Sequence, residues 1–339
     1  MRIAVDAMGG DHAPRAIVRG AVEALKFLDG DIRLVLVGQD EAVRAELAQL
    51  DGWVGRIDVE HASQVVGMDD VPVDAVRQKR DSSLMRMVAL AAAGQADAVV
   101  SAGNTGACAA ACQLRLKTLP GVQRSGIAVI IPSTYGPKIV CDVGANIAPK
   151  PRHMHQYALM CAIYGRHVLG MDSPRVGLLS VGEEDMKGTQ LVKRTAQLIR
   201  EDASVNFVGN VEGRDLFRGT CDVIICDGFV GNIVLKLTEG LAEGLFRTIR
   251  EELEEQSADL ASRFEPIVQA IWAKHDYSEY GGAPLLGVNG VCIICHGSSD
   301  HRAICNAVRV AHRFVAERVN GAIVRHLGQS AKVGNEQSD

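Results

Sequence analysis

The sequence has few aromatic residues, no long apolar run and little excess of charge of either sign. Phe, Trp and Tyr make up only 4% of the 339 residues, which leaves little for a surface that stacks on nucleic acid bases. No run of about 18 apolar residues occurs, so no membrane-spanning helix is expected. The formal net charge is -5, so an acidic partner would need a local basic patch. We predict a globular protein that binds no nucleic acid.

The first residues also lack the features of an export signal. Residues 1–14 contain acids, glycines and a proline where a signal peptide needs an apolar core. The nine cysteines are odd in number and scattered, which is typical of reduced, buried thiols rather than of a disulfide framework. These features predict a cytoplasmic protein.

Short apolar runs alternate with segments of helical periodicity along most of the chain. The predicted strands are residues 3–5, 32–37, 98–100, 127–131, 176–179, 223–226 and 291–294. The predicted helices between them include residues 16–28, 82–93, 153–164 and 190–199. Continuous apolar strands that alternate with helices indicate a mainly parallel sheet covered on both faces, so the fold class is α/β. We expect residues 1–339 to form a single unit.

Residues 236–275 differ from the rest because they contain no strand pattern. Two apolar stripes at helical spacing predict a helical hairpin inserted into the α/β unit. The stripes are Leu237, Leu241, Leu245, Ile249 and Leu253, and then Phe264, Ile267, Val268, Ile271 and Trp272. Residues 328–339 are predicted to be a flexible tail.

The predicted strands end in small or polar residues that could carry chemistry. Asp6 precedes Gly9 and Gly10, and Ser101, Ser180 and Asp227 follow three later strands. Ligands of open parallel sheets bind beyond the carboxyl ends of the strands. We therefore expect these loops to form one crevice.

The loop from Ser101 through Gly103, Asn104 and Thr105 joins a strand to an Ala-rich helix. Backbone amides at a helix N-terminus bind anions, so the loop is a candidate phosphate cradle. An equally supported alternative is a tight turn in which Asn104 or Thr105 only caps the helix.

Two further loops are candidates. Lys187 follows three acids beyond a strand and could bind phosphate or stabilise an oxyanion, although a solvated charged loop has the same composition. Asp227, Gly231 and Asn232 follow the next strand, where glycines could equally serve a tight connection. No Walker loop pattern occurs. Residues 280–287 are predicted to be a rigid loop that walls a pocket or connects elements.

Residues 292–296, Cys-Ile-Ile-Cys-His, match the pattern for covalent haem attachment only formally. The segment is predicted to be a buried strand, where positions three apart face opposite sides, and haem attachment would need export. The same geometry disfavours a zinc site. His296, at the end of this strand, is a candidate site residue or a structural histidine.

Taken together, these segments resemble the PlsX family, the phosphate acyltransferases of bacterial fatty acid and phospholipid synthesis. The matching segments are residues 4–14, 101–107, 142–146, 180–184 with 187–188, 228–232 and 276–290, which span nearly the whole chain. The resemblance implies a three-layer α/β/α architecture like that of isocitrate and isopropylmalate dehydrogenases and of phosphotransacetylase. It also implies a homodimer in which the hairpin lies at the dimer and touches the membrane, here through Ile267, Ile271 and Trp272.

The resemblance implies the transfer of a long-chain acyl group from acyl carrier protein to inorganic phosphate, without metal or other cofactor. Lys187 and the Asn104 and Thr105 loop would hold phosphate, while Asn232 and amides near Gly231 or Gly10 would stabilise the oxyanion. The other candidates, for orienting groups, substrate contacts or protonation of the thiol, are Asp6, Gly9, Ser101, Gly103, Asp227 and His296. The expected partner is the downstream acyl-phosphate:glycerol-3-phosphate acyltransferase, with peripheral contact at the inner face of the cell membrane.

Because carrier proteins of this kind are acidic, their docking surface should be basic. Arg77, Lys79, Arg80 and Arg86 form the densest cluster, and Arg115, Lys117 and Arg124 form a second one. An ordinary solvated helix face would look the same.

Two other functions were considered. A nicotinamide-dependent dehydrogenase shares the implied architecture but needs an aspartate metal cluster and an arginine-rich acid site, and neither pattern occurs. A scaffold that gathers lipid enzymes at the membrane has no need of the polar loops.

Overall fold

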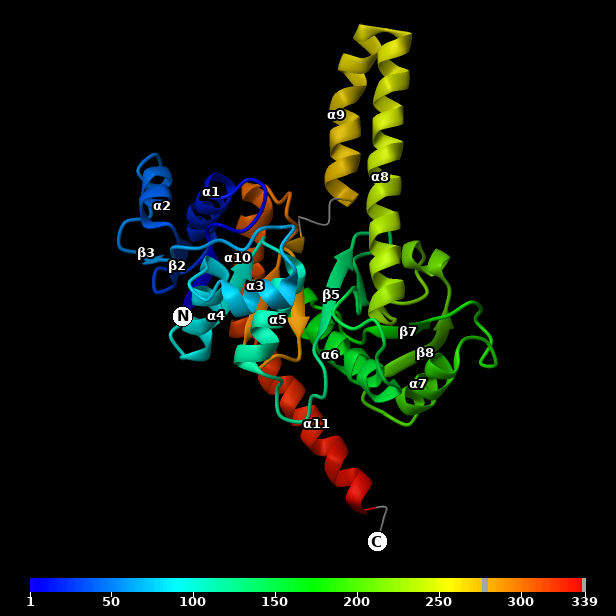
Figure 1. Cartoon of the computed structure of the whole chain (residues 1–339). Helices are drawn as coiled ribbons and strands as arrows, with labels where there is room; N and C mark the ends of the chain where they lie inside the picture. The colour runs from blue at the N-terminus through cyan, green and yellow to red at the C-terminus, as the bar shows by residue number, and fades with distance from the viewer. Residues whose placement is uncertain (276–279, 337–339) are drawn as a thin grey trace.

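The computed structural model describes residues 1–275 and 280–336, and within these the side chains of residues 272–275 and 329–336 are not described. The chain forms one 11-stranded sheet in the order β3-β2-β1-β4-β11-β10-β5-β6-β9-β7-β8 (Figure 1). The strands are β1 Arg2–Asp6, β2 Arg33–Gly38, β3 Ile57–His61, β4 Ala98–Ser101, β5 Gly126–Ile131, β6 Lys138–Cys141, β7 Arg175–Leu179, β8 Asn206–Val211, β9 Val223–Ile225, β10 Ala283–Leu286 and β11 Val291–Ile294. Every strand predicted from an apolar run is present.

The helices cover both faces of this sheet, which confirms the predicted three-layer α/β/α arrangement. They are α1 Arg15–Ala24, α2 Asp40–Leu47, α3 Pro72–Gln78, α4 Ser83–Ala92, α5 Thr105–Leu116, α6 Pro151–Leu169, α7 Gln190–Arg200, α8 Gly228–Gln256, α9 Ala258–His275, α10 His301–Ala316 and α11 Val319–Glu336. Residues alternate between two cores along each strand: Val5 packs on the side of α1, α6 and α10, and Ala4 on the side of α4 and α5.

The two halves of the sheet run in opposite directions. β10 is antiparallel to both β11 and β5, and β5 is antiparallel to β6. The remaining pairs are parallel. An odd number of reversals separates β11 from β6, so β6, β7 and β9 run opposite to β1, β4 and β11. The sheet is therefore mixed rather than fully parallel.

The prediction that residues 280–287 form a loop was wrong in part. Ala283–Leu286 is strand β10, with its last three residues buried, and it links the two halves of the sheet. Gly281, Gly282 and Pro284 are loop and turn formers, which hides a short strand from a propensity argument. The strand exists because two neighbouring strands satisfy its backbone groups.

The helical hairpin is formed by α8 and α9, which extend side by side from the α/β body (Figure 1). An ion pair between Arg250 and Glu265 links the two helices, with Nε and Oε2 3.4 Å apart. α8 begins at Gly228, earlier than the predicted start, so the same helix belongs to both the body and the hairpin. Its apolar stripe is exposed: Leu237 and Leu241 are each 68% accessible.

Two other segments bear on the predictions. Residues up to Glu336 of the predicted tail continue α11, and residues 337–339 lie outside the described part of the chain. Among the helices that the structure describes, none combines the length and the apolar composition needed to cross a bilayer.

Candidate active site

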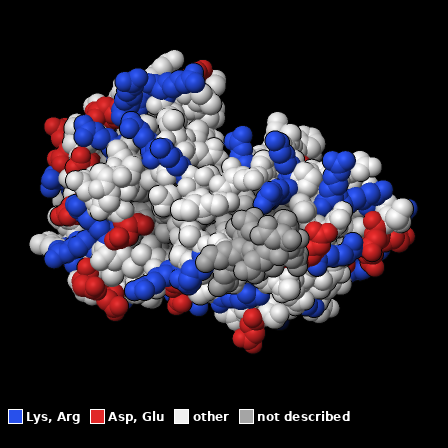
Figure 2. All heavy atoms as spheres, turned by 90° about the horizontal axis from the view of Figure 1, so that it is seen from below, with Lys and Arg blue, Asp and Glu red and all other residues white. Residues whose placement is uncertain are grey.

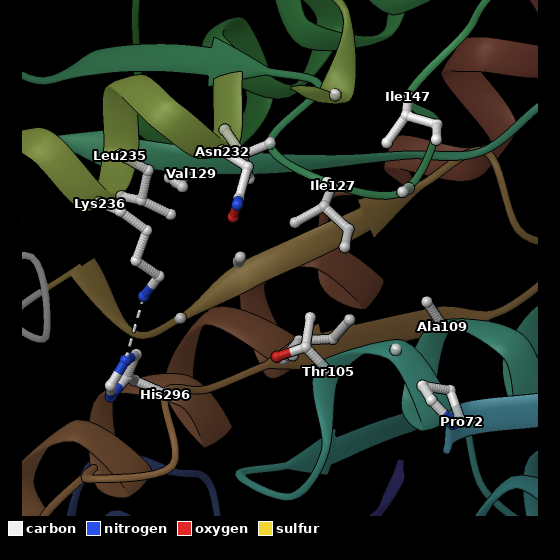
Figure 3. A pocket seen from close by; sticks show the side chains of 18 of the residues that line it. Pro72, Thr105, Ala109, Ile127, Val129, Ile147, Asn232, Leu235, Lys236 and His296 are labelled. Carbon is white, nitrogen blue, oxygen red and sulfur yellow. Dashed lines mark hydrogen bonds between the residues drawn. The ribbon is translucent and has the colours of Figure 1, made fainter. Parts of the chain in front are cut away.

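A cavity of about 540 Å³ lies between α5 and α8, over strands β5 and β11. Its walls are largely apolar, with contributions from Ile127, Val129, Ala109 and Leu235. The polar side chains in the lining are Thr105, Gln113, Asn232, Lys236, Glu239 and His296. Figure 3 shows Asn232 and Lys236 projecting into the space from α8, and Thr105 facing it from α5. Such an apolar pocket with a few convergent polar groups is typical of a small-molecule site.

The start of α8 is held by a close approach of two backbone segments. Asp227 caps the helix, because its Oδ1 accepts hydrogen bonds from the N–H groups of Phe229 at 3.0 Å and Val230 at 2.9 Å. A Cβ on Gly231 would lie 1.9 Å from the carbonyl oxygen of Asp142, so only glycine fits there. Asp227 and Gly231 therefore set the position of α8, and neither lines the cavity.

The segment against which α8 packs is itself organised around a buried carboxylate. Asp142 accepts hydrogen bonds from the backbone N–H groups of Ile127, Ala145 and Asn146. Asn146 also donates to the hydroxyl of Tyr157 at 2.8 Å. Burial raises the pKa of the Asp142 carboxyl above its ordinary value. This network makes the 142–146 loop a rigid support for the first turn of α8.

Asn232 and Lys236 lie one turn apart on α8, so both face the cavity. Lys236 Nζ donates to Glu239 Oε2 at 2.7 Å and lies 3.4 Å from His296 Nε2 (Figure 3). The pair joins α8 to the end of β11, across the point where the sheet changes direction. The site thus has a cation and an imidazole in contact above apolar walls.

The second ring nitrogen of His296 has its own partner. Nδ1 is 2.7 Å from Ser298 Oγ. Nδ1 also accepts a hydrogen bond from the backbone N–H of Ser298 at 3.3 Å, so these contacts hold the ring beside Lys236. His296 is exposed and lines the cavity, and it remains a candidate site residue.

On the opposite wall, the structure separates Asn104 from Thr105. Asn104 Oδ1 accepts from the N–H of Ala107 at 3.0 Å, which makes Asn104 the N-cap of α5. Its Nδ2 donates to the carbonyls of Met68 and Asp70, each at 3.0 Å. Asn104 is therefore a capping residue, in agreement with the alternative of a tight turn that caps the helix. Thr105 is exposed and lines the cavity.

The residues expected to bind substrate at the end of the first strand are tightly packed against one another and leave no space for a ligand. Ser101 Oγ donates to Asp6 Oδ2 at 2.8 Å and accepts from the N–H of Gly103 at 3.1 Å. A Cβ on Gly9 would lie 2.7 Å from both Asp6 Oδ2 and the nitrogen of Gly103. Asp6 is 2% accessible, and burial raises the pKa of its carboxyl. Neither these residues nor Gly10 line the cavity; they join β1 to β4.

Lys187 lies elsewhere, on the loop between β7 and α7. It is exposed and does not line the cavity. Glu183 and Asp185 on this loop pair with Arg214 and Arg200. The loop after β7 therefore lies outside the cavity, although the helix that follows the neighbouring strand β9 reaches it.

Sequence reasoning missed Lys236. It was assigned to the start of the hairpin, whereas α8 carries it past the cavity. The available signal was its spacing of four from Asn232, which places both on one helical face. The direction of α8 relative to His296 is a tertiary feature and left no trace in the sequence.

The basic cluster predicted for docking is partly neutralised. Lys79 Nζ is 2.5 Å from Asp70 Oδ2, and Arg86 Nε is 2.6 Å from Asp81 Oδ1. Arg77 and Arg80 are exposed at the end of α3. Figure 2 shows that, on the face opposite the hairpin, basic and acidic side chains are interspersed.

Solved structures with a similar fold were found by comparison. A phosphotransacetylase from Streptococcus pyogenes superposes with a TM-score of 0.65 at 16% sequence identity, covering 94% of each chain. A putative 4-hydroxythreonine-4-phosphate dehydrogenase from Salmonella typhimurium gives 0.51 at 14% identity, covering 92% of this chain and 99% of that chain. The chain therefore has the α/β fold shared by phosphotransacetylases and these dehydrogenases, as predicted.

Sequence comparison is more specific. The profile of the family described as "Fatty acid synthesis protein" matches residues 1–322. A phosphate acyltransferase from Citrifermentans bemidjiense is 48% identical over 336 residues, which covers 97% of this chain and 94% of the relative. The chain belongs to this family, the PlsX phosphate acyltransferases, and is an acyltransferase of fatty acid and lipid synthesis.

Proposed function

We propose that this enzyme transfers a long-chain fatty acyl group reversibly from acyl carrier protein to inorganic phosphate. The product is an acyl phosphate for phosphatidic acid synthesis. One observation carries the proposal: the cavity has apolar walls suited to an acyl chain and a polar cluster of Thr105, Asn232, Lys236 and His296 suited to phosphate and a thioester. The relatives named phosphate acyltransferase support the same reaction class.

In this mechanism a phosphate oxygen attacks the thioester carbonyl carbon. A C–O bond forms and the C–S bond breaks. The departing sulfur takes up a proton and leaves as the thiol of the carrier protein. Phosphate dianion is already nucleophilic, so the enzyme needs chiefly to position it and to stabilise the oxyanion.

The side chains around the cavity divide these tasks. Lys236 and Thr105 bind phosphate from opposite walls, and the amide of Asn232 donates to the oxyanion. His296 takes a proton from the attacking hydrogen phosphate and passes it to the departing thiolate, which leaves as the thiol. Lys187 is a second proposed phosphate contact, although its loop does not line the cavity.

The experiment is phosphate-dependent thiol release from long-chain acyl carrier protein, with hydroxylamine to trap acyl phosphate. Wild type should need phosphate and yield trapped product, and Lys236→Met should reduce kcat/KM by about 10²–10³-fold, the loss expected for one transition-state donor. Lys187→Met tests the loop contact separately. Thiol release without phosphate, or none from folded enzyme, would overturn the proposal.

Carrier-protein docking is proposed at the end of α3. Pro72 and Val73, at the start of this helix, line the cavity, and Arg77 and Arg80 are exposed at its other end. Reversing both charges should raise KM for acyl carrier protein without changing kcat. A double reversal of Arg194 and Arg218, which are exposed and belong to neither basic cluster, is the matched control. An unchanged KM in the Arg77 and Arg80 double variant would argue against this surface.

The α8 and α9 hairpin is proposed to form the homodimer. Its exposed stripe, which includes Leu241 and Leu245 at 68% and 56% accessibility, would be covered by a second copy. Ile267 and Ile271 are 51% and 43% accessible and remain the proposed membrane contact, while the Trp272 side chain lies outside the described residues. This placement would hand acyl phosphate to the downstream acyltransferase at the membrane. Sedimentation of Leu241→Glu against wild type tests the dimer.

A further inference from the structure

Three cysteines that the proposed reaction does not use lie together behind the cavity. Cys108 and Cys112 are one turn apart on α5, and Cys292 faces them from β11. Their Sγ atoms all lie within 4.8 Å of one another, and those of Cys108 and Cys292 are 3.7 Å apart. The tertiary structure thus groups Cys292 with two cysteines from a distant part of the sequence.

These thiols are sealed in an apolar environment. Cys108 and Cys112 are 0% accessible and Cys292 is 2% accessible, among the aliphatic side chains of the core on this face of the sheet. With bonds of about 2.3 Å from sulfur to a common centre, three sulfurs stand at most about 4 Å apart, and closer when the centre carries a lone pair and is pyramidal. The observed spacing therefore fits a shared three-coordinate centre with little movement of α5 or β11.

Charge decides which centre the cluster can hold. A buried complex that carries net charge is costly unless a counter-charge lies beside it. The carboxyl that interacts with Cys108 is that of Asp6, which is an acid and offers no compensating positive charge. Three thiolates around a monovalent or divalent cation would leave net negative charge, whereas a trivalent centre gives a neutral complex.

We propose that Cys108, Cys112 and Cys292 form a binding site for trivalent arsenic, held as a neutral three-thiolate complex. Arsenous acid is the reacting species. Three As–S bonds form and three As–O bonds break, and each thiol proton leaves with one hydroxide as water. Arsenic and sulfur keep their oxidation states, so no oxidant or reductant is needed.

The catalytic cavity provides the approach to this site. Ala109 and Gln113, the neighbours of Cys108 and Cys112 on α5, line the cavity, and so does Ile294, on the same side of β11 as Cys292. Because the thiols lie behind this wall, arsenite should bind slowly. Arsenic bound to two residues of α5 should also lower turnover, because it would displace or stiffen the helix that carries Thr105.

Intact-mass spectrometry of the wild-type enzyme with arsenite and a phosphine reductant is the first test. We expect a single adduct with the mass of one arsenic less three hydrogens. Alkylation in denaturant should then find Cys108, Cys112 and Cys292 protected and the other cysteines modified. No adduct, or protection of a different set, would overturn the proposal, and this outcome is independent of whether the acyl transfer proposal holds.

Variants sharpen the test. Cys112→Ala should retain arsenite about 100-fold less tightly than wild type, since even weaker changes around a bound centre cost 10–100-fold. Cys305→Ala, a buried cysteine on α10 outside the cluster, is the control and should behave like wild type. Equal retention by Cys112→Ala and wild type would refute a three-thiolate site. Circular dichroism verifies folding, and the wild-type protection pattern decides the matter if a variant does not fold.

Discussion

Two strand-to-helix connections in this enzyme look alike in sequence and differ in use. Both Ser101–Gly106 and Asp227–Asn232 place glycines and a polar cap ahead of a helix. In the first, Ser101 donates to Asp6 at the end of β1, Asn104 donates to the 67–70 loop, and Thr105 and Gly106 line the cavity. In the second, the cap and glycines fix α8, and Asn232 and Lys236 further along the helix reach the cavity.

The comparison shows that residues which resemble an anion-binding loop in sequence can use their hydrogen-bonding groups to stabilise the loop itself. A cap accepts the first backbone N–H groups of its helix, which leaves few donors for a ligand. The groups that reach the ligand lie after the cap, on the part of the helix whose direction the cap has set. The following predictions separate positioning from contact in these two connections.

The largest effect is expected for Lys236→Met. Removal of the ammonium should lower kcat/KM by about 10²–10³-fold, or about 3–4 kcal/mol, with little change in stability because the side chain is 52% accessible. Steady-state kinetics and thermal melts measure both. Arg247→Met, farther along α8, is the control. Equal kinetics in the two variants would remove Lys236 from the mechanism.

Gly231→Ala should lower the free energy of unfolding by about 3 kcal/mol, because the new Cβ would meet the Asp142 carbonyl. Relief of that clash must move α8 away from the 142–146 loop. Urea denaturation gives the stability change. Wild-type stability in this variant would mean that the close approach does not position α8.

Asn104 and Thr105 should show opposite behaviour although they are adjacent. Asn104→Ala should cost about 1–2 kcal/mol of stability, because the cap and the bonds to the 67–70 loop are lost. Thr105→Val keeps the shape and should preserve stability while it lowers kcat/KM about tenfold, the loss of one hydrogen bond to bound phosphate. If both variants mainly lost stability, Thr105 would be a structural residue too.

Asp6→Asn should produce the smallest effect, and one that depends on pH. Burial raises the pKa of the Asp6 carboxyl above its usual 3.8, so the folded state binds a proton more tightly than the unfolded chain. Its contribution to stability is complete below pH 3.8 and is lost as the pH rises through the raised folded-state pKa. Wild type should therefore lose stability relative to Asp6→Asn as the pH rises. Urea denaturation across that range measures the difference, and a constant difference would contradict the assignment.

Much of the fold follows from local patterns. The apolar runs at residues 3–5 and 98–100 became β1 and β4 because a strand buried on both faces needs a continuous apolar sequence. Four strands were not predicted, namely β3, β6, β8 and β10; β6, with the sequence Lys-Ile-Val-Cys, is short and begins with a charged residue, and β8 begins at an exposed Asn206. β3, with the sequence Ile-Asp-Val-Glu-His, is half-exposed, and β10 contains a proline.

The candidate site was less accessible to sequence reasoning. Asn232, Thr105 and His296 were expected in the site and line the cavity, whereas Asp6, Gly9 and Ser101 lie in a packed junction. The residues that follow β4, β9 and β11 share one cavity, through Thr105, Asn232 and His296, whereas those that follow β1 and β7 do not line it.

The sequence by itself determined the family, the α/β class and the amphipathic hairpin, because these depend on residue identity and short-range periodicity. Only the tertiary structure decided that the sheet reverses at its centre, that α8 brings Lys236 to His296, and that three distant cysteines share one buried point. Each of these depends on contacts between residues far apart in the chain, whose energies depend on packing and leave no periodic trace in the sequence.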